Sequence, residues 1–477
     1  MFERGKGFNS LNERLSGESS KLKIDDDRAI ELIKESLQLH LRNQFSFEDL
    51  MGWRIPPEHL IAKDEVARKK RDLAKITYRK IYETIAKFIE NECNSSTGLL
   101  NKYDINRVRM ASICEKALNE CLGFGPIEPL FNDPLVMEII IVNPFKIIIE
   151  RAGRKVDISK PEKYSDDPEL LKLLAKCGTF KSEDHCKAIL ERMLQPLGKS
   201  IDINRPISSA RLPDGSRLMA QIYPISVDGT TISIRRFRQD IDENAYLEKG
   251  TWNMEIMEFL RNCVVGRLNI IVAGGTSSGK TTTLNILSGY IPKDEWPITI
   301  EDNAELQFKH PYVRRLEARE KNTEGLGEVT QRTLLRTALR MRPDRIVMGE
   351  MRGEEAYDVI NANNTGHDGG LTTAHANSAF DALSRILNMA LTAGTGLPSE
   401  AIKGQIISAF DLVVYQERFR DGRRVITEIS AIDENVRDEF SLINVFKYDF
   451  KSATWKKNNE LPLYYLDKMR KNGVSIH

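Results

Sequence analysis

The chain lacks a charge excess of either sign, a long apolar run and a secretory leader. Its 477 residues include 70 Lys and Arg against 69 Asp and Glu, so the formal net charge is +1. Such a balance offers no large basic footprint, and no nucleic-acid partner is expected. The apolar stretches at residues 136–142 and 268–273 are far shorter than the roughly 20 residues of a membrane helix. The first residues lack the apolar core of a secretory signal. We therefore expect a cytoplasmic protein, at most peripheral to a membrane.

The chain also lacks paired cysteines. None of its six cysteines forms a Cys-x-x-Cys pair, so neither a zinc ribbon nor a disulfide framework is expected. Reduced, buried thiols are the ordinary alternative. These residues are Cys93, Cys114, Cys121, Cys177, Cys186 and Cys263.

Composition and periodicity divide the chain into five parts. Residues 1–55 are polar apart from an amphipathic run at 29–41, which predicts a flexible arm with a possible helix. Pro56 and Pro57 break the chain, and residues 56–122 show helical periodicity. Residues 123–248 hold short β-type runs and turns, typical of a small α+β domain. Residues 249–440 alternate strands with helices, which predicts an α/β domain with a parallel sheet. Residues 441–477 form a tail without recognisable chemistry.

The pattern Gly-x-x-x-x-Gly-Lys-Thr begins at Gly274, after an apolar strand and before an amphipathic helix. In this context a glycine-rich turn points backbone N–H groups at phosphate oxygens, and the helix N-terminus adds positive potential. Lys280 is expected to reach the β- and γ-phosphates, and the Thr281 hydroxyl to ligate Mg²⁺. The sequence thus predicts that ATP and Mg²⁺ bind at Gly275, Thr276, Ser277, Ser278, Gly279, Lys280, Thr281 and Thr282.

Two apolar strands downstream end in acidic residues. One leads into Glu301 and Asp302, and the other leads into Gly349 and Glu350. Strand ends of one parallel sheet would place these carboxylates beside the nucleotide. Glu301 is then a candidate base for the attacking water, although an acidic turn without chemistry is the alternative. Glu350, on a strand expected beside the phosphate loop, would hold Mg²⁺ through water or polarise the nucleophile.

Two histidines occupy a segment rich in Thr and Gly, residues 365–377, between the expected helices 356–363 and 379–391. His367 and His375 are either ordinary core or surface residues or sensors of the nucleotide. The phosphate loop alone fits a kinase, a GTPase, a helicase or a motor. No Asn-Lys-x-Asp guanine pattern follows it, which disfavours a GTPase.

In this order the segments resemble the secretion ATPase superfamily that drives type II and type IV secretion and pili. The resemblance covers residues 123–418, with the phosphate loop, an "Asp box" (299–305), residues 334–344, Gly349–Arg352 and a "His box" (365–377). Residues 123–130, 210–217, 232–237, 349–353 and 365–370 look most like the CpaF/TadA-type ATPases of tight-adherence (Tad) pili. The lack of a tetra-cysteine zinc site argues against type II assembly and pilus-extension relatives. Archaellum and conjugation-type ATPases share much of the pattern and are close rivals.

The resemblance implies a RecA-like ATPase domain preceded by a PAS-like α+β domain, joined by a linker near 238–250. It implies a homo-hexamer on the cytoplasmic face of the inner membrane, where platform proteins would hold it. Glu301 would be the general base, Glu350 the second acid and a Mg²⁺ ligand, and His375 the γ-phosphate sensor.

Arg217 and Arg235 match arginines that reach the nucleotide from the N-terminal domain of such ATPases. Arg211 and Arg236 are close enough in sequence to be alternatives. Arginine suits the role because its fork stabilises charge on a transferring phosphoryl group. Surface arginines bridging to carboxylates are the competing interpretation.

The sequence therefore predicts a motor ATPase that powers assembly or retraction of a Tad-type pilus or a related secretion machine. A conjugation-type traffic ATPase is the alternative within the same enzyme class. A nucleotide-gated scaffold that barely hydrolyses ATP and a nucleic-acid translocase are competitors from other classes. The presence of Lys280, Glu301, Glu350 and His375 argues against the scaffold, and the balanced charge argues against the translocase.

Overall fold

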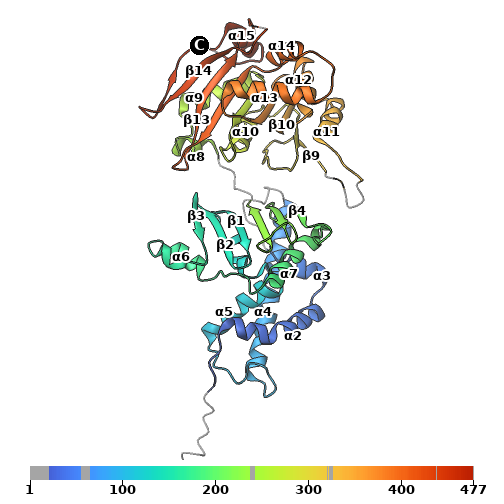
Figure 1. The fold of residues 1–477 in the computed structure, drawn as a ribbon, viewed down its shortest axis with the longest axis vertical. Helices are drawn as coiled ribbons and strands as arrows, with labels where there is room; N and C mark the ends of the chain where they lie inside the picture. The colour runs from blue at the N-terminus through green and yellow to red at the C-terminus, as the bar shows by residue number, and fades with distance from the viewer. Residues whose placement is uncertain are drawn as a thin grey trace, which may run out of the picture. The chain divides into compact units, whose positions relative to one another are not determined.

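The computed structural model describes residues 21–54, 65–236, 242–319, 321, 326–436 and 438–475. They belong to two compact units that divide between Gln239 and Asp240 (Figure 1). The first 20 residues of the expected arm, the break at Pro56 and Pro57, and residues 237–241 of the expected linker lie outside the described residues. Each unit is described by itself.

A helical region opens the first unit. Apolar residues at helical spacing give its long helices one buried face each, and Ile81, Ile85 and Ile89 are fully buried. Asp25 and Asn106 cap two of the helices by accepting a backbone N–H in the first turn. The helices are α2 (Asp26–Gln44), α3 (Phe47–Gly52), α4 (Glu65–Asn94) and α5 (Arg107–Cys121).

An antiparallel six-stranded sheet in the order β3-β2-β1-β6-β5-β4 forms the rest of the first unit. The side chains of each strand point alternately to the two faces of the sheet. One face buries residues such as Ile139 and Ile232 in a core shared with Ile189 of α7. The elements are η2 (Gly125–Phe131), β1 (Val136–Asn143), β2 (Lys146–Arg151), β3 (Arg154–Asp157), η3 (Pro161–Tyr164), α6 (Pro168–Leu174), α7 (Glu183–Leu194), η4 (Gln195–Leu197), β4 (Ile207–Arg211), β5 (Arg217–Gln221) and β6 (Thr231–Arg235).

Buried acidic side chains join the helical region to the sheet. Glu120 of α5 lies 3.0 Å from the His185 ring and 3.3 Å from the Lys34 ammonium. Glu128 pairs with Arg54 at 2.5 Å. The two parts, which the sequence analysis treated as separate domains, thus keep separate apolar cores but lie in one compact unit.

The second unit is built on a nine-stranded mixed sheet in the order β15-β14-β13-β12-β7-β11-β10-β8-β9. The strands from β12 to β9 are parallel, and β13, β14 and β15 extend the sheet in antiparallel pairs. The elements are α8 (Glu243–Glu248), α9 (Met254–Val265), β7 (Ile270–Gly274), α10 (Lys280–Ser288), β8 (Pro297–Glu301), β9 (Arg314–Glu317), α11 (Gln331–Ala338), η5 (Leu339–Met341), β10 (Arg345–Met351), α12 (Glu355–Asn364), β11 (Leu371–His375), α13 (Ala379–Thr392), α14 (Ser399–Ala409), β12 (Leu412–Arg418), β13 (Arg424–Ile432), β14 (Leu442–Asp449), β15 (Thr454–Lys457) and α15 (Leu463–Lys471).

Helices cover both faces of this sheet (Figure 1). Ile270 and Val272 of β7 belong to a core with α9, α10 and α15, whereas Ile271 and Ala273 belong to a core with α11 to α14. A strand buried on both faces reads as a continuous apolar run. The expected parallel sheet flanked by helices is therefore present.

Three segments lie elsewhere than expected from the sequence. Helix α2, expected as part of a flexible arm, has Ile33 and Leu37 buried in the core of the helical region. Helix α8, assigned there to the first domain, belongs to the second unit. The expected tail supplies β14, β15 and α15, of which Tyr465 and Met469 are buried in the core of that unit. Short amphipathic elements at the end of a chain give a weak sequence signal, because their buried side is completed by strands far away in the sequence.

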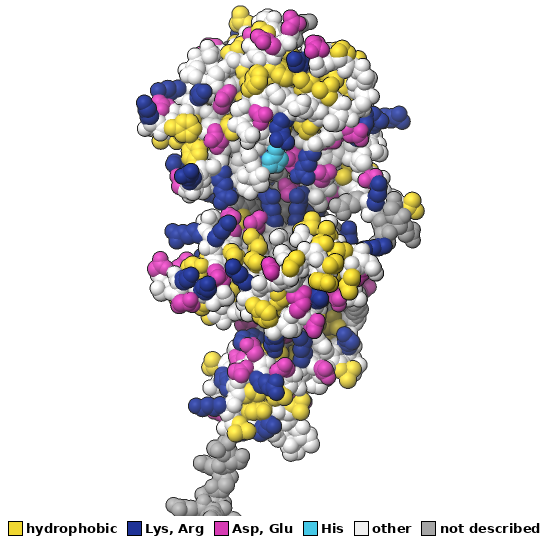
Figure 2. Space-filling model, in the orientation of Figure 1, with side chains coloured by type: hydrophobic (Ala, Val, Ile, Leu, Met, Phe, Trp, Pro, Cys, Tyr) yellow, Lys and Arg dark blue, Asp and Glu magenta, His cyan; other side chains and the backbone are white. Residues whose placement is uncertain are grey.

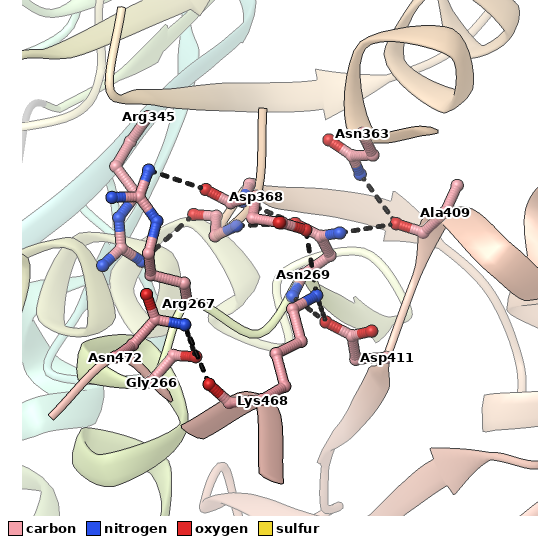
Figure 3. A network of polar contacts seen from close by, with 12 residues as sticks. Gly266, Arg267, Asn269, Arg345, Asn363, Asp368, Ala409, Asp411, Lys468 and Asn472 are labelled. Atoms are coloured by element: carbon pink, nitrogen blue, oxygen red, sulfur yellow. Dashed lines mark hydrogen bonds and ion pairs between the residues drawn. The ribbon is translucent and has the colours of Figure 1, made fainter. Parts of the chain in front are cut away.

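A polar network lies at the amino ends of the central strands of the second unit (Figure 3). The side-chain oxygen of Asn269 accepts the N–H groups of Gly369 and Gly370, and the backbone N–H of Asn269 donates to Oδ2 of Asp411. Asp411 is 2% exposed and pairs with Lys468 of α15 at 2.8 Å. Burial raises the pKa of Asp411 to about 6, against the opposing charge of Lys468. Helix α15 is thereby fixed to the sheet.

The described surface agrees with the low net charge. Figure 2 shows acidic and basic side chains on the visible faces of both units. Within the described ranges, no helix has the length and apolarity to cross a membrane. All six cysteines are free thiols, five of them buried and Cys177 half-buried.

Replacing Lys468 by Met should destabilise the second unit by about 3–5 kcal/mol near pH 8, because the buried Asp411 carboxylate loses its cation. The folded pKa of Asp411 lies above the ordinary 3.8, so the folded state binds a proton that the unfolded state releases, and stability falls as pH rises through this window. Without Lys468 the pKa of Asp411 should rise further, so that the carboxyl group stays protonated in the folded state up to a higher pH. The stability lost on replacing Lys468 should therefore be smaller near pH 5 than near pH 8. Unfolding monitored at both pH values checks this. Lys471→Met, exposed on the same helix, is the control, and equal losses at both pH values would contradict the assignment.

Candidate active site

The phosphate loop, residues 274–281, connects β7 to α10. Gly279 caps the helix with φ +101°, a conformation that residues with a side chain rarely adopt. Helix α10 then begins at Lys280. Thr281 and Thr282 follow in its first turn, both half-buried. The predicted phosphate-binding residues are thus continuous at the carboxyl end of a central strand.

Lys280 is 7% exposed, and its ammonium is held inside the site. Its Nζ donates to the Gly275 carbonyl at 2.9 Å and lies 3.4 Å from Nδ1 of His375. The pKa of His375 is lowered, by burial first and by the Lys280 cation next, while Glu350 opposes the shift. His375 is therefore neutral near pH 7, with Nδ1 accepting from Lys280 and the hydrogen on Nε2.

Strand β11 lies between β7 and β10, and this corrects the expectation that the Glu350 strand neighbours the phosphate-loop strand. The intervening strand ends at His375, which is the register partner of Gly274. Its Thr-rich sequence lies in the segment expected between two helices, where no strand was predicted, and residues 371–374 are buried. The insertion places the His375 ring between Lys280 and Glu350, with Nε2 3.0 Å from Oε1 of Glu350.

An arginine orients Glu350. Arg352 donates to Oε2 of Glu350 from Nε at 2.9 Å and from a terminal nitrogen at 2.6 Å, and it also reaches Asp302 at 3.4 Å. The sequence analysis gave Arg352 no role. The sequence signal for this pairing was the position of Arg352 two residues after Glu350 at the end of a strand, because alternate residues of a strand lie on the same side of the sheet.

The predicted Mg²⁺ ligands are Thr281 and Glu350. Oε1 of Glu350 is buried and accepts no hydrogen bond from the described residues, despite the nearby His375 nitrogen. The same residues hold no cluster of three or more His, Cys, Asp or Glu that would bind a metal alone. Mg²⁺ at a nucleotide usually takes one or two protein groups and fills its shell with phosphates and water. The donor set fits an ion that arrives with a nucleotide.

Glu301, the last residue of β8, lies one strand beyond Glu350 and is 3% exposed. Its Oε2 accepts the N–H groups of Glu305 and Leu306 at 2.7 and 2.8 Å, while Oε1 is buried without a partner among the described residues. Burial raises the pKa to about 7, although those two N–H groups and Arg315 oppose the shift. A carboxyl group with a pKa near the working pH suits a general base. Glu301 also organises the turn after its strand.

His367 lies apart from this group. It precedes β11, whereas His375 ends that strand. Its backbone N–H donates to the carbonyl of Ala362 at the end of α12. Of the two histidines in the segment, the structure brings His375 alone into contact with Lys280 and Glu350.

Three arginines lie side by side on the sheet of the first unit. Arg217 of β5 is the register partner of both Arg211 and Arg235, and Arg235 is also opposite Glu138. Side chains directly opposite on neighbouring strands lie within about 5 Å at Cβ, and like charges there repel. The row Arg211–Arg217–Arg235 thus brings together three cations, with Glu138 opposite Arg235.

Arg236, the other sequence alternative, has a structural role instead. Its side chain is 7% exposed and donates to the carbonyls of Leu130 and Phe131. The guanidinium also lies over the Phe131 ring. Neighbouring residues in a strand point to opposite faces, so Arg235 and Arg236 diverge.

Gly349→Ala should lower ATP turnover by ~10-fold while leaving nucleotide affinity within about twofold, since only a positioned catalytic group is displaced. A Cβ at Gly349 would lie 2.9 Å from Cγ of Glu301 and would push that side chain aside. Steady-state kinetics and nucleotide titration measure the two effects. Gly404→Ala, where an added Cβ meets open space, is the control. Unchanged turnover in Gly349→Ala would remove Glu301 from the catalytic group.

The chain is similar to proteins of a known family. The family model "Type II/IV secretion system protein" matches residues 120–435. A putative conjugal transfer protein of Mycobacterium tuberculosis (strain H37Rv) is 37% identical over 322 residues, 66% of this chain and 85% of that protein. Protein VirB11 of Agrobacterium fabrum is 30% identical over 319 residues, 61% of this chain and 87% of that protein.

Solved structures of similar proteins include the VirB11 ATPase of the Brucella suis type IV secretion system in complex with sulphate. It is 28% identical and covers 64% of this chain and 95% of its own, with a TM-score of 0.34. The pilus retraction motor PilT with bound ADP is 19% identical and covers 71% and 84%, with a TM-score of 0.43. Because the family model spans more than half of the sequence, the chain belongs to the type II/IV secretion system ATPase family.

Proposed function

We propose that this ATPase works as a homo-hexamer that powers a type IV secretion machine of the conjugation type. The choice of machine is supported by relatives named as a conjugal transfer protein and as VirB11, at 37% and 30% identity. The observation that carries the chemistry is the contact series Lys280–His375–Glu350 beside the phosphate loop. By the resemblance, the first unit supplies a PAS-like domain, the second is RecA-like, and platform proteins hold the ring at the cytoplasmic face of the inner membrane.

In the proposed reaction, the loop N–H groups and Lys280 bind the phosphates of ATP. Lys280 moves from Nδ1 of His375 to the phosphate oxygens, and the Nε2–H of His375 is the donor that would then reach the γ-phosphate. Glu301 takes a proton from water, whose oxygen bonds to the γ-phosphorus as the bond to the ADP oxygen breaks. Thr281 and Glu350 would hold Mg²⁺, whose charge offsets that of the triphosphate.

A Tad-type pilus motor is the second candidate. The segments that resemble the CpaF/TadA-type ATPases are residues 123–130, 210–217, 232–237, 349–353 and 365–370. This candidate shares the chemistry above and differs in the machine that uses it. Experiments in cells can therefore distinguish the two candidate functions, whereas assays of ATP hydrolysis cannot.

Lys280→Ala should lose nucleotide affinity, because the point charge on the β- and γ-phosphates is removed. Glu301→Gln and Glu350→Gln should each bind ATP but lower turnover by ~10²-fold or more, since an amide neither accepts the proton nor replaces the charge. Equilibrium titration and phosphate release measure both. Glu354→Gln, an exposed partner of Arg332, is the control. Near-parental turnover in either Gln variant would contradict the role of that carboxylate.

The same Lys280→Ala substitution, introduced into the host, separates the two machines. Loss of conjugative transfer with surface pili retained supports the conjugation-type assignment. Loss of pili with transfer retained would overturn it in favour of the pilus motor.

Arg217→Ala and Arg235→Ala should each lower turnover by ~10-fold or more and leave ATP affinity within a few-fold, because the arginine row is proposed to stabilise charge that develops on the transferring phosphoryl group. The kcat and the nucleotide Kd measure the two effects separately. Arg154→Ala, an exposed arginine on β3 of the same sheet, is the matched control. If both variants hydrolyse ATP at the parental rate, these arginines are structural.

A further inference from the structure

The glycines of the phosphate-loop pattern lie against a residue that is not part of that pattern. Gln416 of β12 is fully buried and is the register partner of Gly274 on β7. A Cβ at Gly274 would lie 2.2 Å from the Gln416 carbonyl oxygen, and a Cβ at Gly279 would lie 3.0 Å from Nε2 of its side chain. The close approach of β12 therefore requires a glycine at Gly274, and at Gly279 it adds to the requirement set by the φ of +101°.

A chain of hydroxyl groups connects Gln416 to the first turn of α10. The Thr283 hydroxyl donates to Oε1 of Gln416 at 2.5 Å. Its hydrogen is thus used, so the Tyr246 hydroxyl, 3.1 Å away, is free to donate to it. The Tyr246 hydroxyl also donates to the Gly279 carbonyl at 3.3 Å, so its single hydrogen is shared between that carbonyl and the Thr283 oxygen. Tyr246 is 3% exposed and comes from α8, so three separate elements meet beneath the loop.

Arg424 of β13 also contacts the loop. Its Nε donates to the Ser277 carbonyl at 3.0 Å, and its Cδ would lie 3.2 Å from a Cβ at Gly279. Ser277 has φ +59°, a left-handed conformation that a residue with a side chain adopts only at a cost. The hydrogen bond from Arg424 holds the carbonyl of this strained residue in place.

We propose that Tyr246, Gln416 and Arg424, together the loop support, are positioning residues of the nucleotide site. They hold the phosphate loop in its binding conformation through Gly279, Ser277 and Thr283, without touching phosphate themselves. The inference rests on the proposed function in that the loop binds nucleotide phosphates. If the loop is in its binding conformation for only a fraction of the time, its apparent affinity for phosphate ligands falls in proportion to that fraction. Every ligand held by the loop is affected alike, whether or not it carries a nucleoside.

Arg424→Gln and Tyr246→Phe in the full chain test this proposal, with ADP and inorganic pyrophosphate as probes in calorimetric titration. Both Kd values should rise by the same factor, ~5–10-fold in each variant, as expected for a smaller competent fraction. The KM for ATP should rise with them while kcat stays within about twofold, because bound phosphates re-form the loop. Arg424→Lys should behave like Arg424→Gln, since it keeps the charge and loses the Nε donor.

Arg423→Gln is the matched control, one residue away and paired with exposed Asp421. Weaker binding of ADP without weaker binding of pyrophosphate would overturn the proposal, because the loop support would then act on the nucleoside part of the ligand and not on the phosphate loop. A lower unfolding midpoint with unchanged Kd values would also overturn it and leave a purely structural role. Failure of the parent chain to bind ADP would instead refute the proposed function.

Discussion

The buried strand β11 is the constraint on which the candidate site depends. Parallel pairing sets its register to β7 on one side and to β10 on the other, so that His375 lies level with Gly274. A shift of one residue would turn the His375 ring to the opposite face. The contacts of His375 with Lys280 and Glu350 therefore follow from backbone hydrogen bonds along the whole strand.

The two edges of the parallel sheet treat buried polar groups differently. At the amino edge Asn269 and Asp411 have partners throughout, and Arg345, fully buried, is paired with Glu295. At the carboxyl edge one carboxylate oxygen of Glu301 and one of Glu350 lack a hydrogen-bond partner among the described residues. Buried polar groups normally find partners, and exceptions gather where a ligand or water completes them. The proposed nucleotide would lie at the carboxyl edge, where it would complete the unpartnered oxygens of Glu301 and Glu350.

The residues of the loop support lie far from the phosphate loop in the sequence. Tyr246 precedes the loop by an entire helix and strand, and Gln416 and Arg424 follow it by more than a hundred residues. The glycine pattern is usually explained by the needs of the phosphate alone. Here the approach of β12 adds a second reason, because a side chain at Gly274 would collide with the Gln416 backbone.

The sequence by itself determined the phosphate-loop pattern, the acidic strand ends and the succession of a helical region, a small α+β part and an α/β part with a parallel sheet. These features depend on local spacing, either the fixed distance between glycines and lysine or an apolar run ending in an acid. Only the tertiary structure decided that β11 separates β7 from β10, that the expected tail joins the sheet, and that Arg211 rather than Arg236 lies with Arg217 and Arg235. Strand order and pairing register arise from contacts between segments far apart in the chain, and local patterns do not encode them.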